Sequence, residues 1–488
     1  MTQSSVEPKT TSEDAGNGSR NPAGRSWLDR YFHISERGST VATEIRGGVT
    51  TFMAMAYILL LNPLILSGKD VDGNVLSQPA LITATALCAA ATTLLMGFWG
   101  KVPLALAAGL SVSGVMASQV VPVMTWPQAM GMSVAYGAVI CLLVVTGLRE
   151  MIMNAIPLAL KHAITIGIGL FIAIIGFVKA GFVHENPAPG GGPVSLGPAG
   201  ELEGWPVLIF AVTLLLIFAL QARNVPGAIL IGIVVGTLVA VVLNAVADIP
   251  GKAWFSGPPE LDGSAVSAPD FSLIGHVSFS GWGDVGYITV TMIVFTLVLA
   301  GFFDAMATIL GVGTEAKLAD EQGRMPGLSK ALFIDGAGGV LGGAGGASGQ
   351  TVFVESATGV GEGARTGLAS VVTGGFFALC LFFTPLTAIV PQEVAAAALV
   401  VIGSMMMQNA KHVDWSDRSV AIPVFLTVVL MPFTYTITTG VAAGVISYVV
   451  IKLAQGKARE VGGFMWALTG VFVIYFAIHP IESWLGVG

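Results

Sequence analysis

Long runs of apolar residues alternate with short polar connections over most of this chain. A helix needs roughly 20 apolar residues to cross the hydrocarbon core of a bilayer. By that measure the pattern predicts about fourteen membrane-spanning segments, at 46–66, 79–99, 103–121, 129–148, 157–180, 205–221, 226–247, 286–312, 329–345, 350–361, 366–390, 392–408, 418–436 and 437–454. A further apolar run at 463–479 indicates either a fifteenth span or a helix at the membrane interface.

Two of these segments interrupt the helical pattern. Segment 103–121 contains Pro103, Gly109 and Gly114, and segment 350–361 is too short to span as a helix and follows a glycine-rich stretch. They are the third and tenth in the series, so each is third in its half. Interrupted segments at corresponding positions of two halves point to the central site of a transporter. We therefore expect an all-α polytopic membrane protein built as a seven-plus-seven inverted repeat, with broken or strand-like backbone in spans three and ten.

The composition agrees with a membrane protein. The chain is 54% hydrophobic and 10% charged, with a mean hydropathy of +0.81, whereas soluble domains carry about 25% charged residues. A soluble fold could not bury this much apolar surface. The pI of about 5.4 and the lack of a basic stripe argue against nucleic-acid binding.

The basic residues indicate the orientation. With the N-terminus in the cytoplasm, the connections expected outside hold only Lys69, Lys179 and Lys252, and the other Lys and Arg residues fall inside. Positive charge favours the cytoplasmic side of a membrane protein. The pattern predicts a multi-pass protein of the cell (inner or plasma) membrane, with polar residues 1–40 as a disordered cytoplasmic tail. The loops at 181–204 and 248–284 are expected to be solvent-facing connections without chemistry.

Two carboxylates lie within apolar segments. Asp304 is the only charged residue between Val285 and Thr314, and Glu355 is the only one from 336 to 361. A carboxylate at a helix centre costs roughly 2.5–3.5 kcal/mol, so such residues face a cavity or a partner. The alternative is a structural ion pair, or a side chain that reaches the interface.

Carboxylates suit a neutral polar substrate with adjacent N–H donors, because one carboxylate accepts two parallel hydrogen bonds. Two carboxylates in one dry cavity repel each other, which favours uptake of a proton. Glu355 and Asp304 are therefore the candidates both for substrate binding and for coupling transport to a proton gradient.

Polar residues on the interrupted segments are further candidates for hydrogen bonds to a substrate: Ser111 and Ser113 on the first, and Gln350, Thr351 and Ser356 on the second. The alternative for each is to satisfy local unwound backbone.

Aromatic residues stand beside both carboxylates. On an extended strand Phe353 would face the same side as Glu355, where it could stack on a planar ring. Phe302 and Phe303 adjoin Asp304, and ordinary packing is the alternative for all three.

Other features read as structural: the Met405–Met407 run as packing, Asp335 as a structural carboxylate, and Glu362 with Arg365 as an exposed cap or local pair. The histidines are scattered, no HExxH motif occurs, and GGAGGASGQT has Gln350 where a phosphate-binding loop needs lysine. No catalytic residue, metal or cofactor is predicted, and the chain is not expected to be an enzyme.

The sequence resembles the azaguanine-type purine permeases (hypoxanthine, guanine or adenine carriers), a branch of the xanthine/uracil, or nucleobase–ascorbate, permease superfamily. The matching stretches are RGGVTTFMAMAYILLLNP (46–63), IPLALKHAITIGIGLFIAIIGFVKAG (156–181), PGAILIGI (226–233), FFDAMATILGV (302–312) and VFVESATGVGEGARTGLASVVTGG (352–375). The last is the most specific, and the resemblance covers roughly residues 40–480.

The resemblance implies a core domain of spans 1–4 and 8–11 (41–150 and 285–391) and a gate domain of spans 5–7 and 12–14 (151–250 and 392–458). Residues 251–284 would be an extracytoplasmic loop, and 459–488 a C-terminal apolar segment and tail. Short antiparallel strands in spans three and ten would meet beside the substrate. The resemblance further implies proton symport of a purine, an elevator-like motion of core against gate, and Asp304, Glu355 and Phe353 in the family's site positions. Members of the superfamily are often homodimers.

This chain departs from the family pattern in span three, where AAGLSVSGVMA (107–117) replaces APGMGLNAFFA. Ser113 stands in place of the asparagine associated with substrate, and Ser111 in place of a glycine. Near Asp304, Gly301 replaces an acidic residue, and Ala305 and Ala307 replace threonine and glycine. Because Ser113 lacks the amide's donor and acceptor pair, the alternatives are a non-purine nucleobase-like compound or another small solute.

Two further alternatives stay open. A sulfate-permease-like anion transporter would share the architecture, but both central charges are acidic. A channel would need repeated polar rings along a pore, and an enzyme would need a nucleophile–base or metal set.

Overall fold

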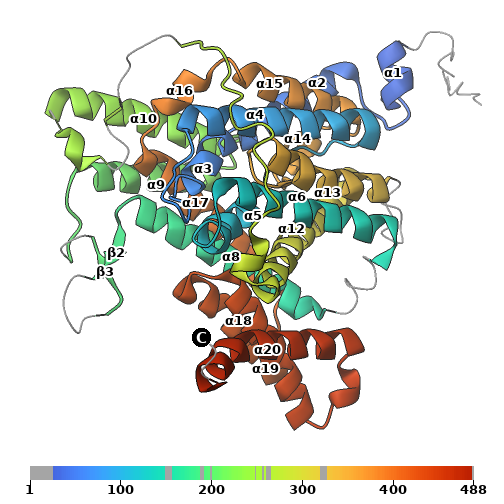
Figure 1. The fold of residues 1–488 in the computed structure, drawn as a ribbon. Helices are drawn as coiled ribbons and strands as arrows, with labels where there is room; N and C mark the ends of the chain where they lie inside the picture. Colours follow the sequence, from blue (N-terminus) through green and yellow to red (C-terminus); the bar gives the residue numbers. More distant parts are fainter. Residues whose placement is uncertain are drawn as a thin grey trace, which may run out of the picture.

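The computed structural model describes residues 26–148, 156–186, 192–197, 200–247, 249–254, 258–259, 265–318 and 327–485, apart from some side chains in these ranges. The molecule is a bundle of helices with two small two-stranded sheets (Figure 1). The described part contains eight helices that are long and apolar enough to cross a membrane, and five shorter apolar helices. This confirms the predicted polytopic, mainly helical architecture.

In the first half the elements are α1 (Trp27–Phe32), α2 (Val41–Met55), α3 (Ile58–Ile65), α4 (Gln78–Leu95), η2 (Met96–Gly100), β1 (Leu106–Ala108), α5 (Leu110–Val115), η3 (Met116–Val120), α6 (Trp126–Val145), α8 (Leu158–Lys179), β2 (Val183–Glu185), β3 (Val194–Leu196), α9 (Trp205–Ala222) and α10 (Ala228–Ala247). They continue with η4 (Gly251–Ala253), α11 (Trp282–Val285), α12 (Tyr287–Glu315), α13 (Leu328–Ala344), β4 (Gln350–Val352), α14 (Ser356–Gly361), α15 (Gly367–Cys380), α16 (Thr384–Ala388), α17 (Gln392–Met406), η5 (Met407–His412), α18 (Arg418–Thr434), α19 (Ile437–Ala454), η6 (Ala458–Glu460) and α20 (Gly463–Leu485).

The helices pack in two sets. Among elements from spans 1–4 and 8–11, α6 packs on α13, and α2 and α4 pack on α15. Among those from spans 5–7 and 12–14, α8 packs on α17 and α18, and α9 packs on α10 and α17. In Figure 1, α18, α19 and α20 lie at the end of the molecule opposite α2 and α15. The run at 463–479 is helical and belongs to α20, which packs on α19.

Two expectations from the sequence need correction, and one loop gains structure. Residues 26–40, expected within a disordered tail, include α1, and Phe32 is buried in a cluster with Ile34 and Leu368 of α15. The loop at 181–204, expected to be a solvent-facing connection, contains a hairpin in which β2 pairs with β3. The predicted span 366–390 is broken, because α15 ends at Cys380 and the separate helix α16 begins at Thr384, with Pro385 in its first turn. Proline lacks the N–H that would continue the preceding helix.

The two interrupted segments meet as predicted. Strands β1 and β4 are antiparallel, with Leu106 opposite Val352 and Ala108 opposite Gln350. The pairing extends beyond the strands through a hydrogen bond of 2.9 Å from the N–H of Gly109 to the carbonyl of Gly349. The pair brings residues of spans three and ten together in the interior.

Side chains of neighbouring helices satisfy the outer edges of this small sheet. The hydroxyl of Thr93 in α4 donates to the carbonyl of Leu106 (2.8 Å) and accepts from its N–H (2.9 Å). On the other edge the carboxylate of Asp335, buried in α13, accepts from the N–H of Val352 (3.1 Å). Unpaired backbone groups are costly at membrane depth, so these side chains allow non-helical backbone there.

Glycines let α6 and α13 pack backbone to backbone. A Cβ atom added at Gly339 would lie 2.7 Å from the Cα of Gly137, and one added at Gly137 would lie 2.5 Å from the backbone nitrogen of Val340. Such distances are shorter than ordinary van der Waals contacts. Only glycine fits at these positions unless the helices separate.

The turn between α3 and α4 is organised by Asp70, which is 6% exposed. Its Oδ1 accepts from the N–H groups of Asp72 (3.0 Å) and Asn74 (2.8 Å), and its Oδ2 accepts from the N–H of Trp126 (3.1 Å) at the start of α6. Burial favours the neutral acid, but these hydrogen bonds together outweigh it and lower the pKa of Asp70.

Candidate substrate-binding site

A cavity of about 360 Å³ lies beside the β1–β4 sheet. One wall comes from Tyr57, the start of α5, Thr308 of α12 and the segment from β4 to Glu355, and the facing wall from α8, α17 and η5. Glu355 is half-buried in the wall, whereas Lys411 and His412 of η5 are exposed. The cavity therefore runs from the interior to an opening at η5.

Glu355 occupies the turn that joins β4 to α14. The strand ends at Val352, and a turn follows in which the N–H of Ser356 donates to the carbonyl of Phe353 (3.1 Å). The prediction that Phe353 and Glu355 share one side of an extended strand is therefore wrong in its geometry, because Glu355 has helical dihedral angles (φ −58°, ψ −18°). Both residues nevertheless line the cavity.

Tyr57 is the direct partner of Glu355. Its hydroxyl donates a short hydrogen bond to Oε1 of the glutamate, and the tyrosine ring is buried where span one divides into α2 and α3. The sequence reasoning missed Tyr57. The available signal was a phenol within the apolar run MAMAYILL, because a tyrosine hydroxyl inside such a run needs a partner.

The candidate serines of span three lie in different surroundings. Ser111 lines the cavity. Ser113 is fully buried and is absent from the cavity lining; its hydroxyl donates to Oδ1 of Asn62 (2.7 Å) and lies 2.8 Å from the hydroxyl of Ser348. Both serines belong to α5, where residues two positions apart point to nearly opposite faces. Ser113 thus joins span one to the two interrupted segments.

The candidates on span ten also divide. Thr351 lines the cavity, whereas Ser356 bonds to the backbone, since its hydroxyl donates to the carbonyl of Phe353 (2.7 Å) and accepts from the N–H of Ala105 (3.0 Å). The amide of Gln350 is buried and donates to the carbonyl of Ser348 (3.1 Å).

The side chains of Asp304 and Phe303 lie outside the described residues, so their predicted roles stay predictions. Their backbone belongs to α12, which contacts α5, β4 and α14. Thr308 lines the cavity one turn further along α12. Positions four apart share a helix face, so position 304 lies on the same face of α12 as Thr308. Phe302 is buried.

The facing wall was not foreseen from the sequence. It consists of Thr165 and Ile172 of α8, Ile402, Met405 and Met406 of α17, and Gln408, Asn409, Lys411 and His412 of η5. Met405 and Met406 therefore line the cavity rather than serve as packing alone. Nothing in their local sequence separates them from methionines that only pack.

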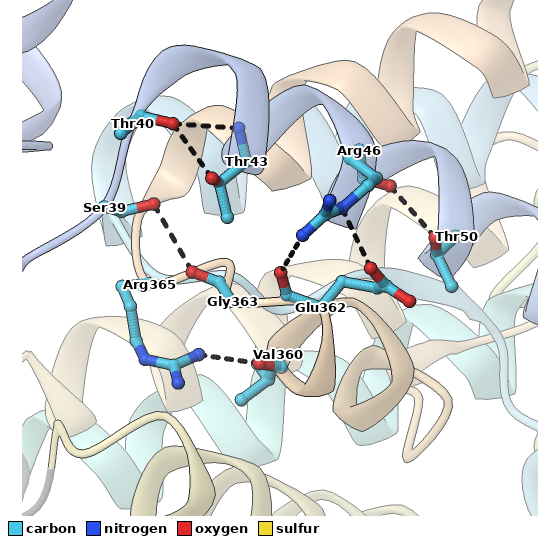
Figure 2. Close-up of polar contacts among 9 residues, drawn as sticks. All are labelled: Ser39, Thr40, Thr43, Arg46, Thr50, Val360, Glu362, Gly363 and Arg365. Carbon is cyan, nitrogen blue, oxygen red and sulfur yellow. Dashed lines mark hydrogen bonds and ion pairs between the residues drawn. The ribbon is translucent and has the colours of Figure 1, made fainter.

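The C-terminal end of α14 is braced against α2, as Figure 2 shows. Arg46 forms an ion pair of 2.8 Å with Glu362 and also donates to its carbonyl (3.0 Å). Arg365 donates to the carbonyl of Val360 (2.7 Å) and so caps α14, as predicted, but the partner of Glu362 is Arg46 rather than Arg365. These contacts fix the short helix that follows Glu355.

A second brace from α2 is buried. The carboxylate of Glu44, fully buried, accepts from the N–H groups of Arg365 (2.8 Å) and Thr366 (3.2 Å) where α15 begins. A carboxylate at a helix N-terminus satisfies donors that have no partner within the helix. Span one thus holds both ends of the connection between spans ten and eleven.

The cavity can bind a small polar molecule with an aromatic face. Glu355 offers acceptor oxygens, Ser111, Thr351 and Thr308 offer hydroxyl groups, and Phe353 offers a ring. Within the described part of the chain, no group of three or more His, Cys, Asp or Glu residues could hold a metal ion.

Comparison with known proteins agrees with this architecture. The adenine permease AdeP of Escherichia coli (strain K12) is 35% identical over 455 residues, covering 93% of this chain and 96% of its own length. The guanine/hypoxanthine permease PbuG of Bacillus subtilis (strain 168) is 35% identical over 459 residues, covering 92% of this chain and 99% of its own length.

Solved structures resemble the fold at lower identity. The transmembrane domain of the cyanobacterial bicarbonate transporter BicA superposes with a TM-score of 0.58 at 18% identity, over 82% of this chain and 97% of that one. The murine anion transporter Slc26a9, in its inward-facing state, gives a TM-score of 0.60 at 12% identity, over 93% of this chain and 77% of that one. These likenesses confirm the predicted seven-plus-seven inverted-repeat fold.

A family model described as "Permease family" (Xan_ur_permease) matches residues 42–443. Together with the relatives above, this match shows that the chain is a multi-pass membrane protein that belongs to the xanthine/uracil permease family.

Proposed function

We propose that this protein imports a purine-like nucleobase by proton symport across the cell membrane. The observation that carries the proposal is the half-buried carboxylate of Glu355, which faces a cavity beside the β1–β4 sheet and accepts a hydrogen bond from Tyr57. The names of the relatives, adenine and guanine/hypoxanthine permeases, supply the class of substrate.

The cavity offers complementary contacts for a purine. The Glu355 carboxylate can accept from adjacent ring and exocyclic N–H groups, as it now accepts from Tyr57. Phe353 provides a surface for stacking, and Thr351 and Ser111 provide hydroxyl groups for the remaining ring nitrogens and carbonyls. Asp304 and Phe303 are proposed to complete the site from α12.

Proton coupling is assigned to Glu355 together with Asp304. A half-buried carboxylate that accepts its hydrogen bond from a neutral hydroxyl is poised to exchange a proton when its surroundings change. Binding of the base near a protonated carboxyl would link the two cargoes energetically.

We assign the transport motion to the boundary between the proposed core and gate domains, at the cavity. Spans 1–4 and 8–11 form the proposed core, and spans 5–7 and 12–14 form the proposed gate. The cavity lies between the segment from β4 to Glu355 on one side and α8 and α17 on the other, so an elevator-like displacement of core against gate would move its contents. We place the N-terminus in the cytoplasm and infer a homodimer.

Uptake of labelled bases into proteoliposomes, with and without an inward proton gradient, tests this function. Hypoxanthine, guanine, adenine and uracil are compared with sulfate and bicarbonate. We expect a purine to be accumulated only with the gradient, and Glu355→Gln to abolish accumulation while the purified variant stays folded. Transport of an anion but of no base would refute the proposal, and full gradient-driven uptake by Glu355→Gln would refute the role of the glutamate.

Asp304→Asn provides the second arm of this experiment. We expect weaker binding of the base, measured by equilibrium binding to the purified protein. Wild-type affinity in that variant would remove Asp304 from the site.

A further inference from the structure

The cavity has opposite electrical character at its two ends. The interior end carries the Glu355 carboxylate and the Tyr57 hydroxyl, and the open end carries Lys411 and His412. The volume of about 360 Å³ lies within the range of sites for drug-sized ligands. A flat two-ring base held at Glu355 would leave the open end unfilled.

The basic open end is assembled from two separate elements. His412 of η5 stacks on His162 of α8, with ring centroids 5.1 Å apart and an interplanar angle of 25°. Lys411 lines the cavity beside His412, and Lys161 precedes His162 in α8. The stack holds the imidazole of His412 in place against the adjacent helix.

Nearby carboxylates are committed to other contacts. Asp414 accepts from the N–H (3.0 Å) and the hydroxyl of Ser416, and Asp417 caps α18 through the N–H (2.8 Å) and hydroxyl (2.9 Å) of Ser419. Neither aspartate lines the cavity. Among the described residues, the lining at the open end presents Lys411 and His412 to a ligand without an acidic side chain beside them.

We propose that this cavity also binds purine nucleoside 5′-monophosphates, with the base at Glu355 and the phosphate at Lys411 and His412. The ammonium group of Lys411 forms charge-assisted hydrogen bonds with phosphate oxygens, and an imidazole N–H of His412 donates a further one. The ribose spans the middle of the cavity. This inference rests on the proposed nucleobase function, because it places the base in the same position.

Such a ligand inhibits transport instead of being carried. It contacts Glu355 in one wall and η5 in the facing wall, so it links the two sides that must separate in the proposed motion. With η5 on the cytoplasmic side, as the distribution of charge predicts, a nucleotide formed from the imported base would slow further import.

Equilibrium binding to the purified protein in detergent tests this inference, using labelled adenine and guanine, their nucleosides, their 5′-monophosphates and inorganic phosphate. The variants are the double substitution Lys411→Gln with His412→Gln, the charge-preserving Lys411→Arg, and Lys457→Gln. Lys457 is an exposed lysine outside the cavity lining and serves as the matched control.

We expect the monophosphate to bind at least tenfold more tightly than the nucleoside and to displace the labelled base. Because a hydrogen bond to a charged group contributes roughly tenfold or more in affinity, the double variant loses that advantage and keeps its affinity for the base. Lys411→Arg retains most of the advantage, and Lys457→Gln retains all of it. Raising the salt concentration weakens monophosphate binding selectively.

A monophosphate that binds no more tightly than its nucleoside, or equally well to the double variant, overturns the inference. Displacement of the base by inorganic phosphate alone also overturns it, because the base and the phosphate could then not be bound in the cavity at the same time. If no base binds to the wild-type protein, the proposed function fails as well; if the base binds and the phosphate adds nothing, only this inference fails.

Discussion

Ser113→Ala distinguishes a structural role of span three from a role in substrate binding. The Ser113 hydroxyl has one proton, which it donates to Oδ1 of Asn62 (2.7 Å). The contact of 2.8 Å with Ser348 must therefore be a bond that Ser348 donates. Alanine removes both bonds in a place where all three residues are fully buried.

The cost of this substitution follows from the group left behind. Oδ1 of Asn62 would lose its donor inside the protein, and an unsatisfied buried polar atom costs about 1–3 kcal/mol. The other end of Asn62 stays bonded to Thr85 (2.9 Å) and to the carbonyl of Ala347 (3.0 Å), so the amide cannot simply turn to find a new partner. We expect a clear loss of stability.

Two measurements on the purified protein separate the alternatives. The thermal unfolding midpoint in detergent reports stability, and equilibrium binding of a labelled purine reports the site. Ser113→Ala should lower the midpoint and leave affinity within about threefold, because Ser113 lies off the cavity lining. The matched control Ser111→Ala, in the lining, should show the reverse. A tenfold loss of affinity with an unchanged midpoint in Ser113→Ala would refute the structural role and restore Ser113 as a substrate contact.

Three further substitutions test other parts of the structure. Tyr57→Phe removes the donor to Glu355 and should reduce gradient-driven uptake more than tenfold without unfolding the protein; wild-type uptake would show that this bond is dispensable. Gly339→Ala should destabilise the α6–α13 contact by about 1–3 kcal/mol through overpacking, whereas an unchanged unfolding midpoint would contradict the close approach of the helices. Because the folded pKa of Asp70 lies below its ordinary value, its stabilising effect is present above the unfolded pKa and is lost as pH falls through the folded pKa. Asp70→Asn should therefore flatten the decline of the unfolding midpoint between about pH 5 and pH 3, and an undiminished decline would assign it to other carboxylates.

The sequence predicted the spans well because burial in lipid requires continuous apolar runs, which are legible locally. The interrupted segments were legible for a similar reason, since Gly109, Gly114 and the glycines before Gln350 weaken any helix. Glu355 was found as a charge in an apolar run. Each of these features depends on the free-energy preferences of residues that are close together in the sequence.

The missed residues depend on contacts between distant parts of the chain. Tyr57 and Glu355 are 298 positions apart, and no local pattern pairs them. Met405 and Met406 look like packing until α17 is placed against the cavity. Ser111 and Ser113 look equivalent in the sequence, and only their helical backbone in α5 sends them to different faces.

The buried bond between Glu44 and the start of α15 has a consequence for how the chain is made. The N–H of Arg365 that binds Glu44 is synthesised 321 residues later, and translation at about 5–20 residues per second takes roughly 16–64 s to reach it. During that interval the first span holds a carboxylate without its native donors. Nascent chains that stop before Arg365 should therefore remain bound to the insertion machinery or be degraded, while chains extended through α15 should be released into the bilayer.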